Sequence, residues 1–103
     1  MNADNTLYSM TEAAHGMFPA LGKFTGEQRR SLVRRIRYCA IDQIKTGERD
    51  PAKIRDACLE RIQSRSDFSS IITLIGIQTL IALVEWIVKR LLDRWVESGD
   101  FLT

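Results

Sequence analysis

The feature that most constrains the fold is an apolar stretch near the C-terminal end of the sequence. Residues 68–88 read FSSIITLIGIQTLIALVEWIV and contain one charged side chain, Glu85. A helix of this length spans about 30 Å, which is the thickness of the hydrocarbon core of a bilayer. The stretch therefore either enters a membrane or forms the buried centre of a helical assembly.

The flanks of this stretch favour a membrane span. Arginine and lysine residues stand on both sides of it, and Trp86 and Trp95 stand near one boundary, where indole rings prefer the interface. Before residue 84 the helix is apolar on nearly every side, and such a helix must be covered all round. We predict that five bulky side chains mark the span: Phe68, Ile72, Ile75, Ile81 and Val88.

A second interpretation is a soluble helical module. Apolar residues recur at alternating spacings of three and four, which is typical of a helix that packs on another helix. This face predicts a homo-oligomer or a larger assembly, in lipid or in water. Its residues are Leu74, Ile77, Ile81, Val84, Val88, Leu91 and Trp95.

Two polar residues lie within the apolar stretch, and we predict that both are buried. Gln78 lies near the middle and needs a hydrogen-bonding partner on another helix. Glu85 is followed one turn later by Lys89, so a salt bridge within the helix is the favoured role. An acid inside a membrane is also a candidate for moving protons or ions.

The remaining sequence predicts an all-α fold, without strand-like alternation or an internal repeat. We expect a short helix over residues 6–15, an amphipathic helix over 26–46 that begins at a capping box, and another over 51–64 that begins after Asp50. A helix of about 30 residues follows, with Gly76 tolerated inside it. The expected organisation is a basic helical domain over 1–66, a long apolar helix over 67–98 and a tail over 99–103.

The helix predicted over residues 26–46 carries a cluster of cations with no acid among them. It presents Leu32, Val33 and Ile36 on one side and arginines on the other. Such a helix binds anionic lipid headgroups, forms the solvated face of a bundle, or follows the phosphates of a nucleic acid. We rank lipid first and nucleic acid last. The arginines are Arg29, Arg30, Arg34, Arg35 and Arg37.

Motifs for catalysis, cofactors or metals are absent from the sequence, so we predict a protein that is not an enzyme. Cys39 and Cys58 fall on apolar helix positions and are expected to be buried free thiols.

Twelve of the 15 lysine and arginine residues precede Phe68. The bias places the N-terminal domain on the cytoplasmic or interior side of a membrane. A soluble cytoplasmic protein is the alternative. The layout suits a small structural or assembly protein of a membrane, such as a virion membrane protein or a phage protein that permeabilises membranes.

Overall fold

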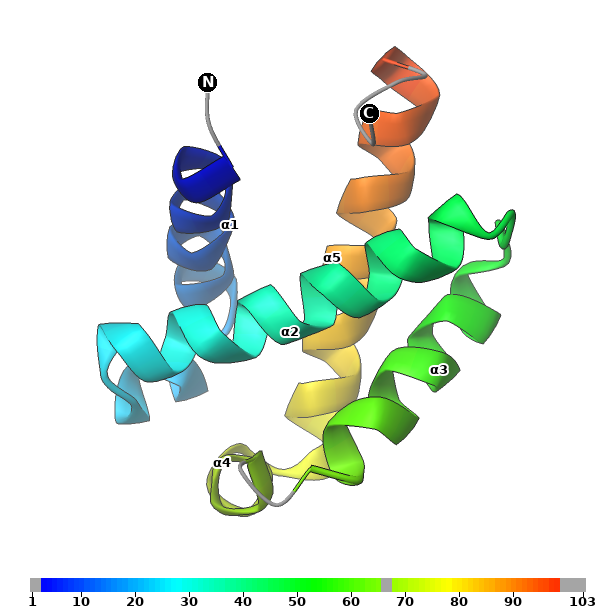
Figure 1. Cartoon of the computed structure of the whole chain (residues 1–103). Helices are drawn as coiled ribbons and strands as arrows, with labels where there is room; N and C mark the ends of the chain where they lie inside the picture. The colour runs from blue at the N-terminus through cyan, green and yellow to red at the C-terminus, as the bar shows by residue number, and fades with distance from the viewer. Residues whose placement is uncertain (1–2, 66–67, 99–103) are drawn as a thin grey trace.

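The described part of the chain is built from helices alone (Figure 1). The computed structural model describes residues 3–65 and 68–98, and the side chains of 7–65 and 68–94. The prediction of an all-α fold is confirmed. The elements are α1 (Ala3–Met17), the 3-10 helix η1 (Pro19–Lys23), α2 (Gly26–Lys45), α3 (Pro51–Gln63), α4 (Ser69–Ile75) and α5 (Ile77–Ser98).

The starts of α2 and α3 follow from their capping residues. Thr25 accepts a hydrogen bond from the backbone N–H of Gln28 at 3.1 Å, and the Gln28 side chain accepts one from the Thr25 N–H at 2.9 Å. The Asp50 carboxylate accepts from the Ala52 N–H at 3.0 Å. These bonds satisfy backbone donors that a helix start leaves without partners. Both helices begin where the sequence predicts.

The long C-terminal helix is interrupted at Gly76. This residue has φ 85° and ψ 150°, a backbone conformation open almost only to glycine. Its N–H bonds to the Ile72 carbonyl at 2.8 Å, and its own carbonyl accepts from the Leu80 N–H at 3.1 Å. Gly76 therefore ends α4 and starts α5.

The prediction of a single helix of about 30 residues is wrong. Of the helices in the described ranges, none is long and apolar enough to cross a bilayer alone. Helices α4 and α5 reach that length and composition together, but they meet at a bend of 101°. The bend lets Ile71 and Ile75 of α4 enter the same core as Leu80 and Leu83 of α5. Burying these side chains offsets the helical hydrogen bonds lost at the bend.

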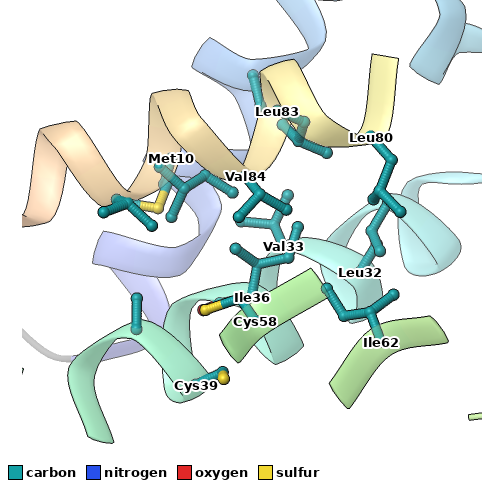
Figure 2. Packing of buried hydrophobic residues seen from close by; sticks show 14 of the residues in the cluster. Met10, Leu32, Val33, Ile36, Cys39, Cys58, Ile62, Leu80, Leu83 and Val84 are labelled. Carbon is teal, nitrogen blue, oxygen red and sulfur yellow. The ribbon is translucent and has the colours of Figure 1, made fainter. Parts of the chain in front are cut away.

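The core lies where α5 packs against α2 and α3, with α1 packed on α2 (Figure 1). Figure 2 shows Leu80, Leu83 and Val84 of α5 beside Val33 and other buried residues of α2. The predicted boundary after residue 66 separates a basic part of the sequence from an apolar part. In the structure, one hydrophobic cluster draws residues from both sides of this boundary. The predicted start of the long helix at residues 66–67 and the tail over 99–103 lie outside the described residues.

Candidate anion-binding groove

A groove runs between α2 and the C-terminal half of α3 and continues to α4. It consists of two adjoining hollows of about 520 Å³ and 290 Å³. Arg35, Tyr38 and Arg65 line both hollows. We call this feature the α2–α3 groove.

The walls of the α2–α3 groove follow from helix spacing. Arg34 and Tyr38 are one turn apart on α2; Arg61 lies in the last turn of α3, and Arg65 follows two residues after the helix ends at Gln63. The connection between the two helices is short, so they run antiparallel and lie side by side. Residues at equal distances from the connection then face each other.

The groove is cationic. Five cations line it: Arg34, Arg35, Lys45, Arg61 and Arg65. Among the described residues that line the groove, Asp42 is the one acid, and its carboxylate lies 3.5 Å from the Arg61 guanidinium. The Arg65 guanidinium lies 5.9 Å from the centre of the buried Phe68 ring. The excess of positive charge makes this surface suitable for phosphate or carboxylate groups.

The other arginines predicted to bind an anionic surface do not line the groove. Arg29 donates to the Leu21 carbonyl at 3.2 Å and to the Phe24 carbonyl, which ties the end of η1 to α2. Arg30 is half-buried beside Gly26. Burial lowers the pKa of the Arg37 guanidinium, and the positive charge of Arg94 lowers it further, against an opposing effect of Tyr38. The structure thus brings Arg34 and Arg35 into the groove and leaves the other three outside it.

An exposed apolar corner adjoins the smaller hollow. Leu74 is 54 % exposed and Ile77 is 39 % exposed, on either side of the bend at Gly76. Ser70 lines the groove, and Leu74 follows it one turn later on the same face of α4. The Lys23 ammonium lies 3.5 Å from the Leu74 carbonyl oxygen. We call Leu74, Gly76 and Ile77 the elbow.

The residues predicted to mark a membrane span mostly lie inside the protein. Phe68, Ile75 and Val88 are buried, while Ile72 and Ile81 are half-buried. In this fold the apolar stretch therefore packs against the other helices of the same chain.

The predicted oligomer face is divided between the core and the surface. Val84, Val88 and Leu91 are at most 1 % exposed because they pack within the chain, so the prediction that they contact another copy does not hold in this fold. Ile81 is half-buried, and the side chain of Trp95 lies outside the described residues. Leu74 and Ile77 are the members of that face that remain exposed among those described.

The prediction that Gln78 and Glu85 are buried is wrong for this fold. Both are exposed, because they lie on the side of α5 that faces away from the core. The Glu85 carboxylate lies 3.9 Å from the Arg55 guanidinium of α3.

Sequence reasoning missed the contributions of Lys45, Arg61, Arg65 and Tyr38 to a common surface. The signal was present in the short connection between the predicted helices over 26–46 and 51–64. An antiparallel pairing places Arg35 opposite Arg61, since they lie at similar distances from that connection.

No family model, curated protein or solved structure matches the chain. Within residues 3–65 and 68–98, no group of three His, Cys, Asp or Glu residues is placed to hold a metal ion. The cations that line the groove make it suitable for an anionic ligand.

Proposed function

We propose that this protein is a small, non-enzymatic membrane-associated protein that docks on an anionic membrane surface through the α2–α3 groove and the elbow. The proposal rests on the position of the elbow directly beside the cationic groove. Leu74 lies one helical turn beyond Ser70, which itself lines the cationic groove. An exposed apolar tip beside a cluster of cations is the arrangement by which proteins rest in the plane of an interface.

The charges contribute more to this docking than the apolar tip does. Each cation near an anionic leaflet adds about 1 kcal/mol, so five cations and one carboxylate supply roughly 4 kcal/mol. Leu74 and Ile77 are already partly buried, and inserting their exposed parts adds about 1 kcal/mol each. Binding is therefore expected to need anionic lipid and to weaken as salt increases.

Vesicle sedimentation tests the electrostatic part. The full chain is mixed with vesicles of phosphatidylcholine alone or of phosphatidylcholine with phosphatidylserine, and the bound fraction is measured. The double variant Arg34→Gln/Arg35→Gln is expected to lose about 2 kcal/mol, or roughly thirtyfold in partition coefficient. The control Lys53→Gln/Lys89→Gln makes the same change in charge at two exposed lysines outside the groove.

The elbow is tested separately. The double variant Leu74→Ser/Ile77→Ser is expected to bind anionic vesicles more weakly, whereas Met17→Ser, at another exposed apolar side chain, is expected to bind normally. Equal binding of the wild-type chain to neutral and anionic vesicles would exclude the groove as the docking surface. Full binding by the elbow variant would exclude insertion of the elbow.

Tyr38 favours single-stranded nucleic acid as a second candidate ligand. Its ring is 59 % exposed and lines both hollows between the arginines, where a base could stack on it. Stacking of a base on an aromatic ring contributes about 1–3 kcal/mol. Binding of a single-stranded oligonucleotide that is lost in Tyr38→Ala, together with no binding to anionic vesicles, would favour this candidate over the membrane.

A further inference from the structure

The two cysteines lie opposite each other in the antiparallel pair of α2 and α3. Cys39 of α2 is 3 % exposed and Cys58 of α3 is fully buried, and neither forms a disulfide (Figure 2). The Cys58 thiol donates to the Ile36 carbonyl oxygen of α2, which lies 3.9 Å from its sulfur. Ile36 lies about one turn before Cys39 on α2, so the Cys58 thiol packs against the part of α2 that carries Cys39.

The two thiols differ in acidity. The hydrogen bond from Cys58 lowers the pKa of the Cys39 thiol to about 7, and the positive charge of Arg61 lowers it further, while burial and the Asp42 carboxylate act in the opposite direction. The hydrogen bond to Cys39 and burial raise the pKa of Cys58. At neutral pH the pair therefore holds one nucleophilic sulfur and one protonated sulfur.

The two thiols also differ in access. Cys39 lines the larger hollow of the α2–α3 groove together with Arg61, Asp42 and Lys45, whereas Cys58 is not among its lining residues. A small molecule that enters this hollow reaches Cys39 first. Cations around the hollow also favour the negative charge that develops on the leaving group of an oxidant.

We propose that Cys39 and Cys58 form a peroxide-reactive dithiol, in which Cys39 is oxidised first and Cys58 resolves it. The Cys39 thiolate attacks one oxygen of hydrogen peroxide, the O–O bond breaks, and the departing hydroxide is protonated to water. The Cys58 sulfur then attacks the sulfenic acid on Cys39, the S–O bond breaks, and the hydroxyl group leaves as water with the Cys58 proton. The two thiols lose two electrons and become a disulfide, while the peroxide becomes two waters.

The disulfide joins the two helices that form the walls of the groove. An S–S bond of about 2.05 Å is shorter than a contact between two thiols, so α2 and α3 must draw closer at this point. The site does not depend on what the groove binds.

The proposal is tested by treating the native full chain with hydrogen peroxide and digesting it without reduction. The expected product is an intramolecular disulfide between the peptides that contain Cys39 and Cys58. Cys58→Ser is expected to retain a sulfenic acid on Cys39 that dimedone captures, and Cys39→Ser is expected to give no dimedone adduct. Circular dichroism of both variants checks that they remain helical.

The expected rate distinguishes a reactive pair from inert buried thiols. A pKa near 7 for Cys39 raises its thiolate fraction at neutral pH more than tenfold over that of free cysteine. A thiolate of lower pKa is also a weaker nucleophile, so the expected gain in reaction rate over free cysteine is about threefold. Competitive iodoacetamide labelling of the wild-type chain gives an independent measurement and is expected to modify Cys39 before Cys58. Reaction only after unfolding in urea, disulfides only between molecules, or earlier modification of Cys58 would each overturn the proposal.

Discussion

The Glu85 carboxylate of α5 pairs with Arg55 of α3, at 3.9 Å, across the interface between the two helices. The sequence favoured Lys89, one turn along the same helix, as its partner. Because α3 packs against α5, a cation from outside the helix lies within reach of Glu85. The side chain of Glu85 is 54 % exposed, so this carboxylate remains in contact with water.

Replacing Glu85 with Gln is expected to leave the urea midpoint of unfolding unchanged. An exposed ion pair contributes little, and Arg55 keeps a closer partner in Asp56 at 3.0 Å. Urea denaturation followed by circular dichroism measures the midpoint. A clear fall in the midpoint would mean that Glu85 is shielded from water in solution, as the sequence predicted.

Local sequence signals predicted where α2 and α3 begin, but they did not predict the break between α4 and α5 at Gly76. The capping box at Thr25 and Gln28 and the cap at Asp50 act within a few residues, so the sequence determines them. A glycine inside an apolar helix costs about 1 kcal/mol, which is small enough for tertiary packing to decide between a straight and a bent chain. Here the burial of Ile71 and Ile75 decides it.

The groove could be predicted only in part for a related reason. The arginines of α2 form a cluster in sequence, but their roles depend on neighbours far along the chain. Arg29 turns to the carbonyls that end η1, whereas Arg35 lines the same hollow as Arg61 of α3 and Arg65. Helical periodicity assigns a residue to a face, and the partner of that face comes from the packing of helices.

Gly76→Ala is expected to destabilise the fold by about 1–3 kcal/mol, because alanine at positive φ is strained. An added Cβ meets nothing within 4 Å, so the cost comes from the backbone and not from a clash. The same change favours a continuous helix through α4 and α5. Urea denaturation measures the loss.

Gly16→Ala is the matched control for this change. Gly16 lies within α1 and its Cβ also meets nothing within 4 Å, so alanine is expected to stabilise the fold by about 0.5–1 kcal/mol. A neutral effect of Gly76→Ala, beside a stabilising Gly16→Ala, would argue against the bend.

Leu83→Ala is expected to lower the free energy of unfolding by about 2–5 kcal/mol, because Leu83 of α5 is fully buried in the hydrophobic cluster and its truncation leaves a cavity (Figure 2). Leu74→Ala, at the exposed elbow, removes the same atoms and is expected to change it by less than about 1 kcal/mol. Urea denaturation of both variants without lipid makes the comparison. Similar small effects would indicate that α5 does not pack on the other helices in water.

The alkylation rate of Cys39 is expected to rise with pH and reach half its maximum near pH 7, because the thiolate is the reactive form and its pKa is lowered to about 7. The groups that set this value are Cys58 and Arg61 of α3 and Asp42 of α2. Arg61→Gln removes a charge that stabilises the thiolate and leaves Asp42 without its ion pair, so the half-maximum is expected to move to higher pH. Lys53→Gln, at an exposed cation of α3 outside the groove, is expected to leave it in place. Iodoacetamide labelling of Cys39, quantified by mass spectrometry across neutral pH, measures the midpoint. A midpoint at the ordinary value for cysteine in the wild-type chain would show that the Cys58 hydrogen bond does not stabilise the Cys39 thiolate.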